Sequence, residues 1–363
     1  MKVKLGDVCE RGSSNLKQSD VVDKQGDYPI YGAAGYIGNV DFYHQEKPYV
    51  AVVKDGAGIG RTTLCSAKSS VIGTMQYLLP KDNVLPEYLY YVVRHMHLEK
   101  YFTGATIPHI YFKDYKNEEF SLDSLNKQNE IVQTLAKIEK SIETRQIEIK
   151  LLDELIKARF VEMFGDVIIN TKGWEVCSLE QISTSRLGKM LDVKQQTGMH
   201  RFPYLANYNV QWFHFDLTDL REMDFNEADQ IEFDLQDGDL LITEGGEVGR
   251  CAIWHNEVTP CFFQKALHRV RVNRNVIIPE YLAYWFKSHA DYNAFEDIVG
   301  GQSTIAHLPG VKLKQLQVVV PPMELQNDFA AFVAQVDKSK VAVQKALDEA
   351  QTLFDSLMQE YFG

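Results

Sequence analysis

The sequence has no apolar stretch approaching the roughly 18 residues that a helix needs to cross a bilayer. Its opening residues, MKVKLGDVCERG, also lack the apolar segment that follows the positive charges of a secretory signal. We therefore expect a chain that makes no contact with a membrane and works in the cytoplasm.

Cysteine is scarce, and its pattern is uninformative for metal or disulfide chemistry. The five residues are Cys9, Cys65, Cys177, Cys251 and Cys261. Their number is odd, and no two of them form a C-x-x-C pair. This argues against a disulfide framework and against a zinc ribbon, and it fits a reducing cytoplasm. Five plain thiols in globular domains are the simplest interpretation.

Catalytic motifs are missing as well. The ten histidines show no metal spacing such as H-E-x-x-H, and no serine stands in G-x-S-x-G. The segment VVPPM (319–323) is similar to the motif of amino-methyltransferases, but Val320 stands where an Asn or Asp should hold the amino group. A linker before the final helix explains it better. The sequence thus predicts a non-catalytic chain with no metal and no cofactor of its own.

Two glycine-rich segments, KDGAGIGR (54–61) and TEGGEVGR (243–250), suggest a phosphate cradle but match neither common type. A Walker loop needs G-x-x-x-x-G-K-[ST], and a dinucleotide site needs G-x-G-x-x-G. Tight turns between strands, with positive φ, explain the glycines without a ligand. The arginines that end the segments, Arg61 and Arg250, would then face a backbone phosphate or a carboxylate of the turn.

The net charge of −12 counts against nucleic acid at first sight. The acidity, however, is local. Residues 214–239 carry ten carboxylates and one arginine, and residues 324–363 carry seven acids and three lysines. The remainder of the chain is close to neutral. A basic groove elsewhere in the chain is therefore compatible with the composition.

The chain repeats one plan twice, and its 363 residues suit two or more domains. Six segments recur in the same order at offsets that only grow. The pairs are YPIYGAAG (28–35) with FPYLANYN (202–209) at 174, the glycine segments at 189, PEYLYYVV (86–93) with PEYLAYWF (279–286) at 193, and, all at 198, TIPHI (106–110) with TIAHL (304–308), KQNEIV (127–132) with LQNDFA (325–330), and EMFG (162–165) with EYFG (360–363). The rise from 174 to 189 places a fifteen-residue insertion in the second copy, within its acidic segment.

Each copy begins with a region that we predict to be mixed α/β with mostly short strands. YVAVV (49–53) and DLLIT (239–243) are short apolar runs followed by glycine, and ALHRVRV (266–272) alternates apolar and polar residues. Pro86 and Pro279 stand where proline starts a helix. Within the glycine segments, the offset of 189 equates Gly56 with Gly245, Gly60 with Gly249, and Asp55 with Glu244.

Each copy ends in a segment that predicts one long helix. Residues 131, 135, 138, 142, 145, 149, 152, 156, 159 and 163 form a heptad pair that is apolar except for two arginines. The equivalent positions at +198 are apolar except for Lys340, and no proline interrupts either run. Such seams are typical of helices that pack on each other as a coiled coil. The alternative is that each helix only covers its own domain.

This combination resembles the specificity subunit of Type I restriction–modification systems. The first half of that family is matched by YPIYGAAGYIGN (28–39), VVKDGAGIGR (52–61), GATIPHIYFKDY (104–115) and KQNEIV. DGDLLITEGGEVGR (237–250) and GGQSTIAHL (300–308) resemble its second half. The resemblance covers essentially the whole chain. It implies two target-recognition domains, at residues 1–121 and 166–322, separated by two long antiparallel coiled-coil helices at 122–165 and 323–363.

The resemblance also implies a division of labour. Each recognition domain reads one half of a bipartite double-stranded DNA target. The helices dock two methyltransferase subunits, which carry S-adenosylmethionine, and motor–nuclease restriction subunits join for cleavage. A duplicated reader suits two half-sites with a fixed spacing, for example about 34–36 Å between centres.

We hypothesise DNA contacts at several positions. The segment STSRLGKMLDVKQQTGMHR (183–201) has a net charge of +3 and suits phosphate contact as a loop between strands, although a solvated loop explains it nearly as well. Arg269 and Arg271 share a strand face, and offset 193 equates Arg269 with Gln76. Arginine suits guanine and glutamine suits adenine, but an ordinary surface strand is the alternative. The candidate residues are Arg61, Gln76, Arg186, Lys189, Lys194, Arg201, Arg250, Arg269 and Arg271.

Two other functions stay open from the residues alone. A coiled-coil adaptor with duplicated protein- or glycan-binding domains would share the repeat and the helices. A duplicated phosphate-binding enzyme is disfavoured by the failed motifs. The acidic insertion at 214–239 would repel DNA, so it should face away from the duplex or meet a basic partner surface.

Overall fold

The computed structural model describes residues 1–21, 24–104, 107–192, 196–295 and 307–363. The chain divides into two compact units, Met1–Glu148 with Ala342–Gly363, and Ile149–Val341. Each unit contains one recognition region and part of both long helices, whereas the boundaries drawn from the sequence set the helices apart. In the described part of the chain, no helix is long and apolar enough to cross a membrane.

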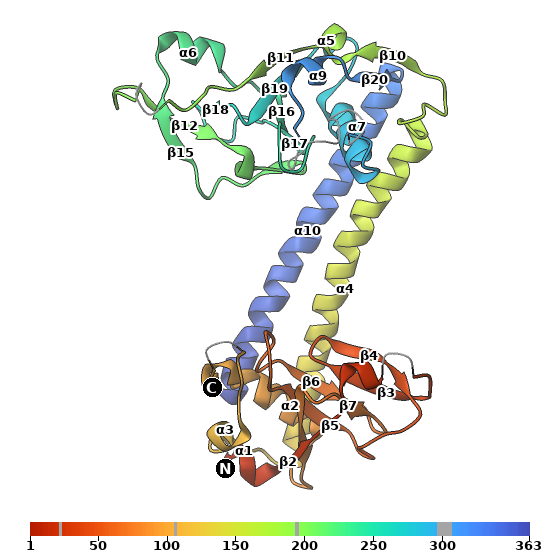
Figure 1. Ribbon diagram of the computed structural model, residues 1–363, viewed down its shortest axis with the longest axis vertical. Coiled ribbons are helices and arrows are strands. Elements are labelled where there is room, and N and C mark those ends of the chain that lie inside the picture. Colours follow the sequence, from red (N-terminus) through yellow and green to blue (C-terminus); the bar gives the residue numbers. More distant parts are fainter. Residues whose placement is uncertain (22–23, 105–106, 193–195, 296–306) are drawn as a thin grey trace. The chain divides into compact units, whose positions relative to one another are not determined.

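The two long helices are α4 (Leu125–Phe164) and α10 (Met323–Phe362), each an unbroken run of 40 residues (Figure 1). In the first unit, Leu135 near the start of α4 packs in one core with Phe354 near the end of α10. In the second unit, Phe164 at the end of α4 contacts Phe329 at the start of α10, with ring centroids 5.4 Å apart. The helices therefore run antiparallel and share a seam, as predicted.

The described residues of the first recognition region form three sheets. Their orders are β2-β8-β5-β6, β4-β3-β7 and β1-β9. The strands are β1 (Lys2–Lys4), β2 (Cys9–Ser13), β3 (Tyr28–Gly32), β4 (Gly35–Val40), β5 (Tyr49–Val53), β6 (Thr62–Cys65), β7 (Ser70–Val71), β8 (Met75–Pro80) and β9 (Glu119–Ser121). The short helices are α1 (Leu5–Val8), α2 (Pro86–His95) and α3 (Phe112–Tyr115).

The second region repeats these sheets with the orders β11-β19-β16-β17, β15-β12-β18 and β10-β20. The strands are β10 (Glu175–Ser178), β11 (Ser183–Leu187), β12 (Arg201–Leu205), β15 (Arg221–Asp224), β16 (Leu240–Thr243), β17 (Cys251–Ile253), β18 (Phe262–Phe263), β19 (Leu267–Val272) and β20 (Gln317–Val320). The helices are α5 (Leu179–Ile182), α6 (Glu227–Glu232), α7 (Pro279–Asp291) and α9 (Gly310–Lys314). A hairpin of β13 (Val210–Gln211) and β14 (His214–Phe215) leads into the acidic insertion at 214–239, which also contains α6.

The strand pairing confirms the mixed α/β fold and its internal repeat. β3 pairs parallel with β7 through Ile30 and Ser70, and β12 pairs parallel with β18 through the equivalent Tyr204 and Phe262. The all-buried β5 is one of the two inner strands of its sheet, with Val50 and Val52 packed under α2 and Tyr49 on the opposite face. Because both faces of this strand are buried, every residue of YVAVV is apolar.

The repeated Q-N pair at the start of each long helix has a structural role. Gln128 is fully buried; its side-chain oxygen accepts from the Leu85 amide at 2.9 Å, and its nitrogen donates to the carbonyls of Asn83 and Asp123. Gln326, at +198, repeats this with the amide of Ile278 and the carbonyls of Val276 and Pro321. The glutamine thus ties the long helix to the start of α2 or α7 and satisfies all its buried polar groups.

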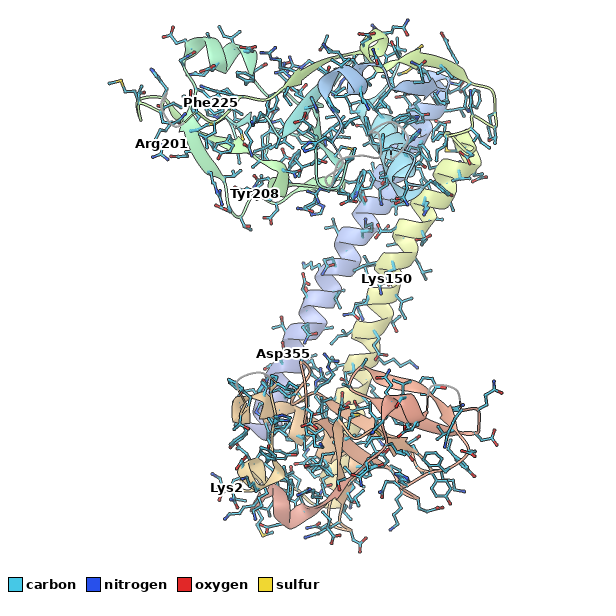
Figure 2. All side chains as sticks on the ribbon, in the orientation of Figure 1. Lys2, Lys150, Arg201, Tyr208, Phe225 and Asp355 are labelled. Carbon is cyan, nitrogen blue, oxygen red and sulfur yellow. The ribbon has the colours of Figure 1, made fainter. Side chains whose placement is uncertain are left out.

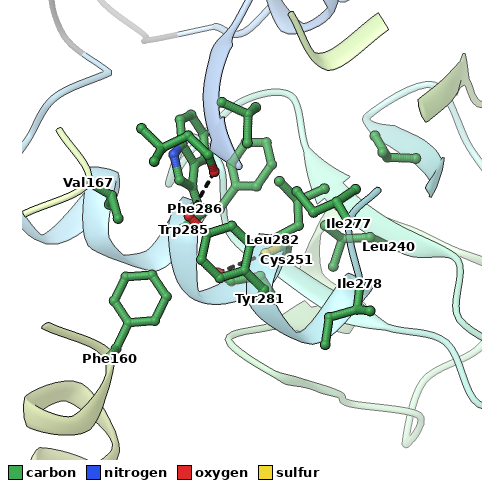
Figure 3. Packing of buried hydrophobic residues seen from close by; sticks show 14 of the residues in the cluster. Phe160, Val167, Leu240, Cys251, Ile277, Ile278, Tyr281, Leu282, Trp285 and Phe286 are labelled. Carbon is green, nitrogen blue, oxygen red and sulfur yellow. Dashed lines mark hydrogen bonds between the residues drawn. The ribbon is translucent and has the colours of Figure 1, made fainter. Parts of the chain in front are cut away.

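Aromatic packing joins the long helices to the second recognition region. Phe160 of α4 lies against Tyr281 of α7, with stacked rings 5.7 Å apart, and against Phe329 of α10 at 5.3 Å. Figure 3 shows the Phe160 ring beside α7, near Tyr281. This core fixes the helices to the sheet, because burying such rings contributes roughly 1.5–3 kcal/mol each.

The register corrects one equivalence between the copies. In the first unit Leu78 lies on the α2 side of its sheet, and in the second Val270 lies on the α7 side. Side chains alternate along a strand, so Gln76 shares the face of Leu78, and His268 shares the face of Val270. Gln76 therefore corresponds to His268 at offset 192, and the predicted equivalence with Arg269 was wrong. A one-residue shift reverses the face of every side chain.

The buried histidine at this position predicts how the stability of the second unit depends on pH. His268 is 1% exposed, and burial lowers its pKa below the ordinary value of about 6.5. The unfolded chain then binds more protons than the folded one below that pH, so the free energy of unfolding should fall as the pH drops below about 6.5. His268→Gln, which installs the residue of the first copy, should flatten this dependence.

Urea unfolding at about pH 7.5 and about pH 5 measures the effect. All four tryptophans, Trp174, Trp212, Trp254 and Trp285, lie in the second unit, so their fluorescence reports on that unit. His289 is also buried with a lowered pKa and should account for part of the residual slope. An unchanged pH dependence in His268→Gln would contradict the prediction.

Candidate nucleic-acid interface

The glycine segments form tight turns between β5 and β6 and between β16 and β17, as predicted. Gly56, Gly60, Gly246 and Gly249 have φ between 79° and 96°, a region that favours glycine. The turn amides are used within the protein. The Gly56 amide donates to the carbonyl of Pro108 at 3.0 Å, and the Gly60 amide donates to the carbonyl of Val53 at 2.9 Å. Each turn therefore holds a loop of the same unit in place through main-chain hydrogen bonds, and we call the turn the seat of that loop.

The seat recurs in both copies with the same hydrogen bonds. The Ile110 amide donates to the carbonyl of Lys54 at 2.9 Å, and the Leu308 amide donates to that of Glu244 at 2.7 Å. These bonds equate Lys54 with Glu244, and hence Asp55 with Gly245 and Gly56 with Gly246. The shared acid and the Gly56–Gly245 match that the constant offset predicted are thus wrong, because the second turn is one residue shorter.

The recurring arginines bind main chain in both copies. Arg61 donates to the carbonyl of Ala33 at 2.9 Å, and Arg250 donates to that of Asn207, the equivalent residue, at 3.1 Å. Arg250 also lies 3.5 Å from the Glu247 carboxylate of its own turn. Each arginine thus links the glycine turn to the end of β3 or β12. Arg61 is exposed, whereas the side chain of Arg250 is only 17% exposed.

The acidic insertion binds four of the predicted DNA contacts. Its carboxylates pair with basic side chains of β11, β19 and the loop after β11. The pairs are Arg186 with Glu232, Lys189 with Asp229 at 2.5 Å, Arg269 with Asp234 at 2.7 Å, and Arg271 with Asp239 at 2.7 Å. The insertion therefore meets a basic surface of its own unit, which neither of the two expectations for it had included.

The two arginines of β19 share a face, as predicted, and that face is covered. The side chain of Arg269 is 13% exposed, and burial lowers its pKa. Arg271 binds both carboxylate oxygens of Asp239 through Nε and Nη2, and this hydrogen bonding raises its pKa. Both guanidinium groups are thus held by acids of the insertion.

The other predicted contacts lie in different environments. Gln76 is 3% exposed and hydrogen-bonded to the Tyr115 hydroxyl at 2.5 Å, so a base contact would require it to leave the core. Arg201 is the first residue of β12, the middle strand of its sheet, and its side chain is 57% exposed (Figure 2). Lys194 lies outside the described residues. Of the segment 183–201, predicted as a loop, residues 183–187 form β11.

A surface that our DNA-contact hypothesis missed lies on the loop seated by the first glycine turn. Phe102, Ile107 and Tyr111 are 61%, 57% and 50% exposed. Their main chain is held by the paired hydrogen bonds between Thr103 and His109, both 2.8 Å. The His109 ring lies 2.6 Å from the Asp55 carboxylate. The recurrence of T-I-x-H was the signal that could have marked this loop as a candidate.

The long helices also carry exposed apolar side chains that their seam does not use. In the second unit, Leu151, Leu155 and Val341 are 62%, 47% and 70% exposed. Leu151 and Leu155 are four residues apart and so lie on one face of α4. Exposed apolar faces on long helices are typical of surfaces that bind another helix.

Comparisons with known proteins agree with this architecture. The family described as "Type I restriction modification DNA specificity domain" matches residues 1–152 and 171–350. The chain is 27% identical over 162 residues to the EcoKI specificity subunit of Escherichia coli K12, and 25% identical over 194 residues to the putative MjaX specificity subunit of Methanocaldococcus jannaschii. These matches cover 43% and 52% of this chain but only 35% and 45% of the relatives.

Solved structures share the fold over nearly the whole chain. The S subunit of a Type I restriction–modification system from M. genitalium has a TM-score of 0.65 at 16% identity, and covers 100% of this chain and 96% of its own. A chain from work on the complex assembly and conformational transition of a type I R-M system has a TM-score of 0.55 at 14% identity, with coverage of 99% and 97%.

Proposed function

Because the chain belongs to the family of the Type I restriction modification DNA specificity domain, we propose that it reads a bipartite DNA target for such a system. The observation that carries this proposal is the duplication itself. Two recognition regions have the same sheets in the same order, and each is built on a stretch of both long helices. A duplicated reader matches two half-sites.

The long helices suit the role of a spacer. Each is continuous and contributes residues to both units. We propose that they set the distance between the two half-sites, and that their exposed apolar residues, among them Leu151 and Leu155, dock the methyltransferase subunits. Two such subunits with S-adenosylmethionine, and motor–nuclease restriction subunits, would carry the chemistry.

The DNA contacts that we propose are the exposed ones. Arg201 can reach a phosphate without breaking a buried ion pair, since its partner Glu222 lies 3.5 Å away at the surface. In the first unit, the seated loop presents Phe102, Ile107 and Tyr111, and apolar side chains of this kind can contact bases or thymine methyl groups. Arg269 and Arg271 would act indirectly, by holding the insertion in place.

Sequencing the methylated bases of a host with and without this chain tests the function. With its methyltransferase partners present, the chain should add one methylated motif made of two short sequences with a fixed gap. A methylation pattern that does not change when the chain is deleted would contradict the proposal. Binding of the assembled complex to the motif should also weaken steeply between 50 and 200 mM salt, because several phosphates are contacted, by an estimated factor of about 10³ or more.

A further inference from the structure

In the first unit, an arginine links a helix of the recognition region to α4. Arg94 of α2 forms an ion pair with Glu139 of α4, and the Tyr91 hydroxyl donates to the same carboxylate at 2.7 Å. The Arg94 guanidinium also lies 5.1 Å from the ring centroid of Phe354 on α10. Glu139 is thus satisfied by a tyrosine and an arginine of its own unit.

The second unit has the same positions but a different arrangement. The offsets of 193 and 198 place Tyr284, Lys287 and Asp337 where Tyr91, Arg94 and Glu139 stand. Lys287 pairs instead with Asp291 at 2.5 Å, at the rim of the same region, and lies 4.8 Å from the ring of Trp212. Tyr284 stacks on Phe213 with centroids 4.3 Å apart.

Asp337 is therefore left without the partners that Glu139 has. Its ion-pair partner is Lys340 at 3.8 Å, and that lysine lies closer to Asp153, at 2.6 Å. Burial, and then the neighbouring Asp153 carboxylate, raise the pKa of Asp337. The two neighbouring carboxylates, Asp337 and Asp153, together favour an added positive charge beside them.

A pocket of about 760 Å³ opens at this place in the second unit. Aromatic side chains line it together with four carboxylates and three lysines: Phe160, Trp212, Phe213 and Tyr284; Asp153, Glu154, Asp291 and Asp337; Lys157, Lys287 and Lys340. Trp212 and Phe213 form the tip of the β13–β14 hairpin, which leads into the acidic insertion. Phe213 has a φ of +65°, an unfavourable conformation for a bulky residue, so the fold holds this ring against the pocket in a strained backbone.

We propose that this pocket binds an arginine side chain of the methyltransferase subunit, in the place where the first unit uses its own Arg94. This rests on the function proposed above. A guanidinium group can stack on the aromatic rings while it pairs with Asp337 and Asp153, as Arg94 does with Phe354 and Glu139. Four carboxylates against three lysines leave one negative charge in excess in the lining, which a bound guanidinium would balance. The two ends of the seam would thus bind the methyltransferase differently.

The test measures binding of the full chain to its purified cognate methyltransferase subunit by calorimetry. Asp337→Asn removes the charge, and Phe213→Gly removes the aromatic wall while relieving the backbone strain. Each should weaken binding about tenfold or more while the variant chain still unfolds cooperatively, the relief of backbone strain in Phe213→Gly offsetting part of the lost stacking on Tyr284. The matched variant Glu139→Gln should do the opposite, lowering the stability of the first unit with an affinity within twofold of wild type.

The outcomes separate this inference from the proposed function. If wild type binds the methyltransferase and directs methylation, but Asp337→Asn and Phe213→Gly bind it within twofold, the pocket does not hold a partner arginine and the proposed function stands. If wild type fails to bind the methyltransferase subunit at all, both proposals fail. Weaker binding restricted to the second-unit variants supports the inference.

Discussion

Arg271→Met should lower the free energy of unfolding of the second unit by about 3–5 kcal/mol. Arg271 binds both oxygens of Asp239 at 2.7 Å, and the Asp239 side chain is only 1% exposed. Removing the guanidinium leaves a buried carboxylate whose remaining donor is the Gln236 amide at 2.7 Å. Urea unfolding followed by tryptophan fluorescence measures the loss, since Trp254 is buried and its amide donates to the Asp239 carbonyl.

Arg201→Met provides the matched control for this variant. Its ion pair with Glu222 is exposed on both sides at 3.5 Å, so its loss should change stability by less than about 1 kcal/mol. We expect the two variants to differ in which property they change. Arg201→Met should weaken binding of the assembled complex to all DNA sequences alike, whereas Arg271→Met should mainly destabilise the unit. Equal stability of Arg271→Met and wild type would contradict the assignment of a structural ion pair.

A double variant tests whether the cost comes from the unpaired charge. Arg271→Met with Asp239→Leu removes both members of the pair, and apolar replacements of buried pairs are often neutral. We expect it to recover most of the stability lost by Arg271→Met alone. If the double variant were as unstable as the single one, packing of the arginine stem, and not the buried carboxylate, would explain the loss.

The repeat, the two long helices and several strands could be predicted because their signals are local. Heptads, alternation in ALHRVRV and proline at the starts of α2 and α7 each arise within a few residues. Duplication adds a second, independent copy of every signal. The register of the strands was harder to predict from the sequence. A segment match at offset 193 was carried back across a loop that differs by one residue, and the face of Gln76 was assigned wrongly as a result.

The candidate interface was harder to predict because its contacts are distant in sequence. Asp234 and Asp239 lie more than 30 residues from Arg269 and Arg271, and nothing in the sequence indicates that they pair. Counting charges therefore assigned the basic residues to DNA and the acidic insertion to some other surface. Likewise, the use of the glycine turn as a seat depends on the Pro108 carbonyl, which lies 52 residues from Gly56.

Exchanging residues 1–121 for the equivalent region of another family member should replace one half of the methylated motif and leave the other half intact. Each recognition region has its own core and its own sheets, and no strand pairs across the two regions in the described part of the chain. The contacts to be preserved at the junction are those of Gln128 with Leu85, Asn83 and Asp123. The readout is sequencing of methylated bases in a host carrying the hybrid.

The gap between the half-sites is the decisive quantity in this exchange. If α4 and α10 set the spacing, a hybrid that keeps both helices should retain the gap of the wild-type motif even though half of its bases have changed. The reciprocal hybrid, with residues 166–322 exchanged, should change the opposite half and keep the same gap. A hybrid whose gap follows the donor region would place the spacing in the recognition domains. A motif unchanged in both hybrids would show that neither region reads DNA.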